Sequence, residues 1–164
     1  MSNLVTTIRG KINQLSAFDQ FLYIAVTNSE GQSLGGYQLN CDAYFRAKSP
    51  QGRRDAIQQL SIKGSTVSVS AGHSGAYFVT QNNDVYHVSH TCDVSLLCSV
   101  EGKIQRLVVS SKGVLIVDLG DKVCIYHSQS GELVNQFSLE ASSCCLDVSI
   151  DGKRFAVGLS NGKI

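Results

Sequence analysis

Residues 107–137, LVVSSKGVLIVDLGDKVCIYHSQSGELVNQF, contain four short apolar runs separated by turn-forming residues, which predicts four antiparallel strands. The first half of this pattern is an apolar strand that reaches a serine and continues through glycine into a second apolar strand. It recurs at residues 67–79 and 146–157. The repeated serines lie 40 and 39 residues apart, at Ser70, Ser110 and Ser149. A fixed period near 40 with several strands per unit is typical of β-propeller blades.

The period divides the chain into four blades, at residues 8–62, 64–100, 102–139 and 140–164. We therefore predict an all-β fold: a β-propeller with about three full four-stranded blades, a partial fourth and an incomplete ring. The last blade stops where its third strand is due, which leaves backbone groups unpaired. We expect a fragment, a truncated product, or a chain that a partner completes.

The first blade is the least regular, with an insertion over residues 40–55. Within the insertion, Ser49-Pro50 is typical of a helix start with proline in the first helical position. The alternative is that residues 56–62 simply form the fourth strand, which we favour because the repeat requires one. The other expected elements of this blade are a turn at residues 27–31 and strands at 11–15, 21–26 and 33–39.

The composition, 43% hydrophobic and 16% charged residues, excludes a disordered chain. The formal net charge is +1, so no overall field attracts nucleic acid or a membrane. No apolar run is long enough to cross a bilayer, and the N-terminus lacks the features of a signal peptide. We expect a cytoplasmic or nuclear protein whose six cysteines stay reduced.

Two segments resemble the motifs of WD-repeat β-propellers, Val148–Gly158 and Asp121–Glu132. Where the family has proline, tryptophan and aspartate, this chain has Ile150, Tyr126 and His127, and the family's Gly-His pair is absent. The resemblance covers residues 8–164 and implies the N-terminal portion of such a propeller. Because the family's Asp–His–Ser–Trp network lacks its His and Trp here, we expect blade cohesion to rest on packing of β-branched side chains.

The resemblance also implies a function. In WD-repeat proteins, the loops between blades and the loops that join second to third strands form one end of the disc. We therefore expect a non-catalytic scaffold that binds other protein subunits of a larger complex, with no cofactor and no small-molecule substrate. Carried over by strand position, the partner-binding residues are Asn83, Asp84, Glu101, Lys103, Asp121, Lys122, Glu140 and Asn161.

The insertion supports an alternative function, because basic residues beside aromatic ones bind phosphates and stack bases. Leu146–Gly152, together with the neighbouring blades and the inserted first blade, also resembles the non-catalytic propeller subunit of a tRNA guanine-methyltransferase, and a ribosome-assembly propeller fits equally well. On this reading the protein belongs to an RNA-processing assembly. Against it stands the common case of a solvated loop with no partner. The residues that would contact nucleic acid or an acidic partner are Arg46, Lys48, Arg53 and Arg54.

Imidazole and thiolate groups gather within twelve residues, and such groups bind zinc. Their spacing matches no known zinc module, and side chains at an odd offset face opposite sides of a strand. We therefore assign no metal site and interpret the segment as a strand that ends in a polar loop. The residues are His87, His90, Cys92 and Cys98.

Cys144 and Cys145 are adjacent, so on a strand they face opposite sides, and we expect one in the core and the other half-exposed. A nucleophilic thiol needs a nearby base and an orienting third group, and no such set clusters in this sequence. We predict no catalytic residues, and a propeller hydrolase ranks last among the functions.

Overall fold

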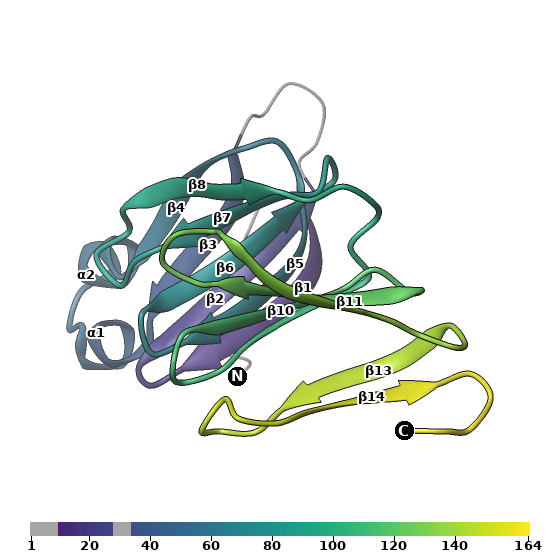
Figure 1. Cartoon of the computed structure of the whole chain (residues 1–164). Coiled ribbons are helices and arrows are strands. Elements are labelled where there is room, and N and C mark those ends of the chain that lie inside the picture. The colour runs from purple at the N-terminus through teal and green to yellow at the C-terminus, as the bar shows by residue number, and fades with distance from the viewer. Residues whose placement is uncertain (1–9, 28–33) are drawn as a thin grey trace.

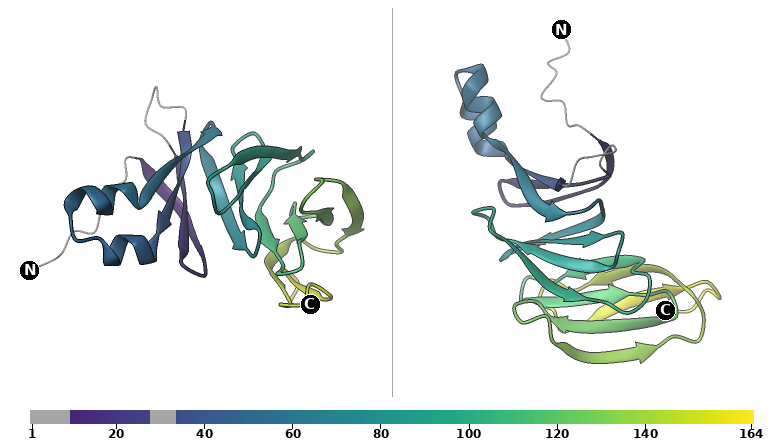
Figure 2. Two further views of the ribbon diagram at one scale, coloured as in Figure 1. Left: turned by 90° about the vertical axis from the view of Figure 1, so that its left-hand side faces the viewer. Right: turned by 90° about the horizontal axis from the view of Figure 1, so that it is seen from above.

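The computed structural model describes residues 10–27 and 34–164. They form three four-stranded antiparallel sheets and one two-stranded sheet, which follow one another like the ribs of a partly opened fan (Figure 1, Figure 2). Within each sheet the strands are ordered as in the sequence. The prediction of an incomplete propeller with three full blades and a partial fourth is confirmed.

The described part of the chain has two helices, and both lie in blade 1, between its third and fourth strands. Its elements are β1 (Lys11–Phe18), β2 (Phe21–Thr27), β3 (Leu34–Asn40), α1 (Cys41–Arg46), α2 (Pro50–Asp55) and β4 (Ile57–Lys63).

Each helix of blade 1 begins at a polar cap. The Asn40 side chain accepts a hydrogen bond from the backbone N–H of Ala43 at 3.0 Å, and Ser49 Oγ accepts one from Gly52 N at 3.1 Å. The helix start at Ser49-Pro50 and the fourth strand, considered as alternatives, are both present. The predicted turn at residues 27–31 and the predicted strand start at Ser33 fall, except for Thr27, outside the described residues.

The remaining blades are plain meanders. Blade 2 consists of β5 (Thr66–Gly72), β6 (Gly75–Thr80), β7 (Asp84–Val88) and β8 (Val94–Ser99). Blade 3 consists of β9 (Arg106–Val109), β10 (Val114–Asp118), β11 (Lys122–His127) and β12 (Leu133–Ser138), and the partial blade 4 of β13 (Ser143–Val148) and β14 (Phe155–Leu159). Among the described residues, no helix has the length and apolar character needed to cross a membrane.

The hydrophobic core lies between the blades, in layers that we call seams. Strand β6 shows why, since all six of its residues are buried. Phe78 packs into seam 1–2 with Tyr23 and Leu60, whereas its neighbour Tyr77 packs into seam 2–3 with Leu115. Adjacent strand residues face opposite sides, so each inner strand serves two seams and no blade buries its own faces. Seam 3–4 is built from Ile116, Val123 and Val157.

The first strands of successive blades, β1, β5, β9 and β13, lie next to one another. Their contacts include serine hydroxyls that accept hydrogen bonds from the backbone of the next blade. Ser16 Oγ accepts from Ala71 N at 2.9 Å, and Ser70 Oγ from Val109 N at 3.2 Å. Side chains thereby connect strands that belong to different sheets.

The repeated serines do not share one role. Ser110 Oγ accepts from Val114 N at 3.1 Å and Ser149 Oγ from Arg154 N at 3.0 Å, so both close turns inside their own blades. Ser70 instead joins blade 2 to blade 3, because β5 continues past it to Gly72.

Because the strands are antiparallel, successive loops lie alternately at the two ends of each sheet along the strand direction. One end, which we call the connection end, holds the links between blades and the loops between second and third strands. The opposite end, the turn end, holds the turns between first and second strands. Helix α1 starts at the turn end, since Cys41 N donates to Gln20 O, in the β1–β2 turn, at 2.8 Å.

Candidate protein-interaction surface

Backbone hydrogen bonds join loops of the connection end in blades 2, 3 and 4. Each bond joins the segment that follows a second strand to a link between blades or, at Ser143, to the first residue of the next blade, at 2.8–3.1 Å. The bonds hold these loops in place on the sheets. Loops positioned by a rigid scaffold commonly carry binding residues. The bonds are Gln81 N to Ser65 O, Val100 N to Asn83 O, Ser143 N to Gly120 O and Ser160 N to Ser142 O.

Two of the predicted partner-binding residues hold this surface together. Asn83 has a left-handed backbone (φ 62°), and its Oδ1 accepts a hydrogen bond from Ile104 N at 3.0 Å. Asp84 accepts one from the hydroxyl of Ser99. Both are half-buried. We assign them to loop positioning, with little free surface for a partner.

The other predicted residues present charges of both signs. Glu101, Lys103 and Asp121 are exposed, and Lys122 is half-buried. At the blade 4 edge, Glu140 pairs with Lys163 at 2.7 Å between Oε1 and Nζ and also accepts from Asn161 Nδ2 at 3.5 Å. The structure thus brings the predicted set to one end as a mosaic of acidic and basic groups.

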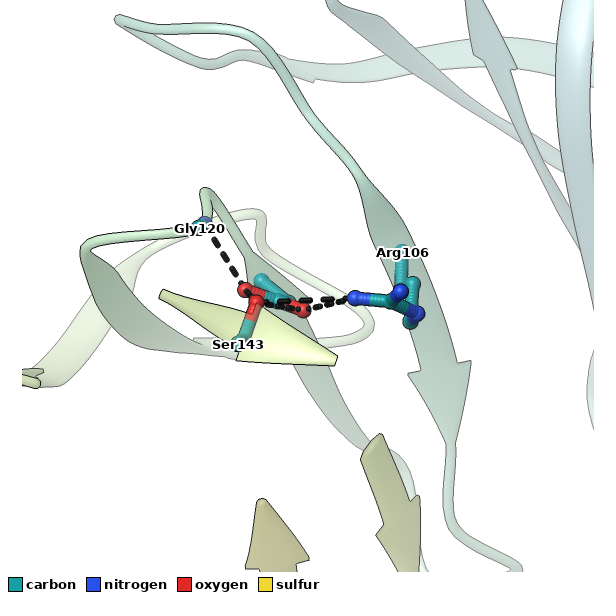
Figure 3. A network of polar contacts seen from close by, with 4 residues as sticks. Arg106, Gly120 and Ser143 are labelled. Carbon is teal, nitrogen blue, oxygen red and sulfur yellow. Dashed lines mark hydrogen bonds and ion pairs between the residues drawn. The ribbon is translucent and has the colours of Figure 1, made fainter. Parts of the chain in front are cut away.

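A buried carboxylate supports the connection end between blades 3 and 4, and sequence reasoning missed it. Asp118 is fully buried at the end of β10. It accepts hydrogen bonds from Ser143 Oγ at 2.6 and 2.7 Å, from Gly120 N at 2.8 Å and from Arg106 Nη1 at 2.9 Å (Figure 3). The signal in the sequence is an aspartate directly after a buried apolar strand and two residues before a turn glycine.

This carboxylate joins two blades because its donors come from both. Arg106 and Gly120 belong to blade 3, whereas Ser143 opens blade 4. A buried charge is tolerated only when its hydrogen bonds are satisfied. Blade 4 is therefore required for Asp118 to keep its full set of partners.

A second buried polar cluster lies at the turn end of seam 1–2. Tyr23 Oη and His90 Nδ1 are 2.8 Å apart, and Gln38 Nε2 donates to Tyr23 Oη at 3.1 Å. His90 Nε2 lies 2.9 Å from the carbonyl oxygen of His73, and the Cys92 thiol donates to Gln38 Oε1 at 2.6 Å. Burial raises the pKa of the Tyr23 hydroxyl and of the Cys92 thiol.

The four residues considered as zinc ligands do not come together around one point, and each contacts other groups. His90 and Cys92 belong to the cluster just described, and His87 Nε2 lies 3.0 Å from the carbonyl oxygen of Ser74. Cys98 packs into seam 2–3. In the described part of the chain, no three His, Cys, Asp or Glu side chains lie close enough to hold a metal ion.

The expectation for Cys144 and Cys145 is wrong, because both side chains are exposed. The pairing of β13 with β14 shifts register between Ser143 and Cys145, which disturbs the simple alternation of faces. Leu146 and Val148 instead supply the apolar contacts of β13 with seam 3–4.

A cavity of about 340 Å³ opens at the outer side of seam 2–3. Burial raises the pKa of Tyr126 to about 12 and also raises the pKa of the Cys98 and Cys124 thiols. These thiols are therefore poor nucleophiles at neutral pH. The cavity is lined by Cys98, Cys124 and Tyr126 and by seven further residues. These are Ser99, Glu101, Leu119, Lys122, Gly131, Leu133 and Gln136.

The basic residues of the insertion do not join the connection end. Arg46, Lys48, Arg53 and Arg54 are on or beside α1 and α2, at the turn end of blade 1. The strand order thus places the two predicted sets of contact residues at different ends of the sheets, and the helices of the insertion lie beside blade 1 (Figure 2).

Comparisons with known proteins identify the fold. No protein-family model and no curated protein matches the sequence. Among solved structures, the chain is similar to the computationally designed Ika4 protein, with a TM-score of 0.68 and 10% identity over 99% of this chain and 96% of Ika4. It is similar to Hsv2 of Kluyvelomyces marxianus, with a TM-score of 0.68 and 10% identity over 96% of this chain and 46% of Hsv2.

A third similar structure is a chain of a mitotic checkpoint complex, with a TM-score of 0.66 and 14% identity over 90% of this chain and 43% of that one. At these identities the likeness shows the propeller fold alone. This chain spans less than half of the two natural proteins and nearly all of the designed one.

Proposed function

We propose that this chain is a non-catalytic scaffold for protein–protein interaction within a larger complex, and that the connection end is its docking surface. The observation that carries the proposal is the set of backbone hydrogen bonds that fixes the connection-end loops of blades 2, 3 and 4. Rigid loops lose little conformational entropy when a partner binds.

The charges of the connection end favour a protein partner. This end carries acidic residues, Glu101, Asp121 and Glu140, together with the basic residues Lys103 and Lys163. A mosaic of both signs suits a complementary protein surface. A nucleic acid is bound by a surface that is mainly basic. For this end we therefore prefer a protein partner to the RNA of the alternative function.

The side chains most capable of catalysis support the non-catalytic part of the proposal. The thiols of Cys92, Cys98 and Cys124 have raised pKa values. His87 and His90 are within hydrogen-bond distance of backbone carbonyl oxygens. A nucleophile requires an adjacent base, and both imidazoles already lie within hydrogen-bond distance of other groups.

The likeness to a chain of the mitotic checkpoint complex supports the proposal, since that propeller is part of a protein assembly. We place the scaffold in the cytoplasm or nucleus, because all six cysteines are free and thiols persist in reducing compartments.

Affinity capture from cells tests the proposal. The charge-reversal pair Glu101→Lys with Asp121→Lys should lose the proteins that the parent chain retains, as measured by quantitative mass spectrometry. The matched control is Glu132→Lys with Asp147→Lys, which changes charge equally at exposed sites away from the connection end. Retention of the same proteins by both pairs, or equal loss from both, would contradict the proposal.

A further inference from the structure

The insertion of blade 1 is a rigid structure that displays one large apolar side chain. We call residues 40–56, which contain α1 and α2, the basic hairpin. Tyr44 is 6% exposed and packs with Leu39 and Ala56, which anchors the hairpin on blade 1. The next residue, Phe45, is 76% exposed. Helix caps at Asn40 and Ser49 fix the geometry that holds one aromatic ring in and the other out.

The charges around Phe45 are mainly positive. The hairpin has four basic and two acidic residues, a net charge of +2, whereas the whole chain has +1. Both carboxylates are already engaged: Asp42 pairs with Arg46 at 3.1 Å, and Asp55 Oδ1 accepts from Gln51 Nε2 at 2.7 Å.

The remaining cations of the hairpin are available to an incoming anion. The Arg53 guanidinium lies 5.9 Å from the centre of the Tyr44 ring, a cation–π contact that restricts its position. Lys48 and Arg54 are exposed and have no ion-pair partner within the described residues. A restricted arginine loses less entropy when it binds a carboxylate.

The hairpin is separate from the connection end. It projects from blade 1 on the side away from blade 2, as both views of Figure 2 show. Its residues take part in no seam between blades. A partner bound here therefore leaves the connection end free for another.

From this geometry we infer that the basic hairpin docks a short acidic protein segment that carries an apolar anchor residue for Phe45. Charge complementarity and the exposed ring define the occupant. An RNA fits less well, because the chain outside the hairpin has a net charge of −1 and offers no extended basic track. A membrane fits less well because six-residue helices give too short an apolar face.

Fluorescence anisotropy tests the inference on the full chain with three probes. These are a labelled acidic peptide of sequence EDDLFDEE, a labelled oligouridylate, and vesicles of phosphatidylcholine with phosphatidylserine. The peptide should bind, and its amide counterpart QNNLFNQQ should bind at least about tenfold more weakly. Stronger binding of the oligouridylate or the vesicles than of the acidic peptide, or no binding of this peptide, would overturn the inference.

Variants locate the peptide site. Arg53→Glu with Arg54→Glu should weaken peptide binding about tenfold or more, and Phe45→Ser about threefold to tenfold. The control Lys11→Glu with Lys63→Glu makes the same charge change on exposed residues of blade 1 at the connection end and should change binding less than about twofold. Equal weakening by the control would refute the hairpin as the site.

Two further measurements separate this inference from other effects. Far-ultraviolet circular dichroism and thermal melting establish that each variant is folded before it is compared. The connection-end pair Glu101→Lys with Asp121→Lys should leave peptide binding unchanged, so the proposed function and this inference can fail independently. Loss of peptide binding in that folded pair would contradict a separate site at the hairpin.

Discussion

Seam 1–2 and seam 3–4 join neighbouring blades of the same repeat in different ways. Seam 1–2 is filled by large apolar side chains, and its buried polar groups, which include Tyr23, Gln38 and Thr66, are uncharged. Seam 3–4 has a smaller apolar layer and a buried carboxylate, Asp118, that requires a donor from the next blade. The first junction therefore depends on side-chain packing, and the last depends on hydrogen bonds to a buried carboxylate.

The largest expected effect is in the packed seam. Phe78 is fully buried and meets Tyr23 edge to face, with ring centres 6.3 Å apart. Phe78→Ala should lower the free energy of unfolding by about 3–5 kcal/mol through lost burial and an unfilled cavity. Urea denaturation followed by circular dichroism measures this. A loss below about 1 kcal/mol would show that seam 1–2 is loosely packed.

Seam 3–4 should be the next most sensitive, through its charge. Asp118→Ala leaves Ser143 Oγ, Gly120 N and Arg106 without their shared acceptor, and should cost about 2–3 kcal/mol. Asp118→Asn keeps one acceptor oxygen and should recover part of the loss. Both variants should speed amide hydrogen exchange in β13 and β14 more than in β5–β8. Uniform acceleration in all blades would contradict a role specific to this junction.

The neutral cluster of seam 1–2 should matter less than the carboxylate. Tyr23→Phe keeps the ring but removes the hydroxyl that contacts His90 and Gln38, and should cost about 1 kcal/mol. Urea denaturation beside Asp118→Asn provides the direct comparison. If Tyr23→Phe is the more destabilising of the two, the contrast between the seams is wrong.

Seam 2–3 lies between the other two and should respond to alkaline pH. Burial is the main cause that raises the pKa of Tyr126 from its usual value of 10.0 to about 12 in the folded chain. Between these values the unfolded chain loses the phenol proton while the folded chain keeps it, so stability falls as pH rises from 10 to 12. Tyr126→Phe should flatten that part of the curve of unfolding free energy against pH. An unchanged slope would place the phenol in solvent.

Local patterns in the sequence were enough to predict the strands and the blade count. Ser49-Pro50 and the repeated turn glycines act within a few residues, so their effects are readable. Gly113 and Gly152, for example, both have positive φ, at 77° and 67°. The predicted partner-binding residues could also be assigned to one end, because the resemblance to WD-repeat proteins gives the end at which each kind of loop lies and the strand order locates those loops in this chain.

The roles of buried polar residues could not be read in the same way. Asp118 precedes a turn, where an exposed aspartate is equally common, and its partner Ser143 is 25 residues away. Asn83 and Asp84 likewise look like free loop residues until their contacts with Ile104 and Ser99 are known. Such roles depend on how blades pack, which a period of 40 residues does not encode.

Chemical cross-linking of the chain to its captured partners, followed by mass spectrometry, tests the central claim most directly. The lysines of blades 3 and 4 divide between the two ends: Lys103, Lys122 and Lys163 are at the connection end, and Lys112 and Lys153 are in turns at the turn end. The docking surface proposed here predicts that partner cross-links concentrate on the first three. Cross-links confined to Lys112 and Lys153 would contradict it.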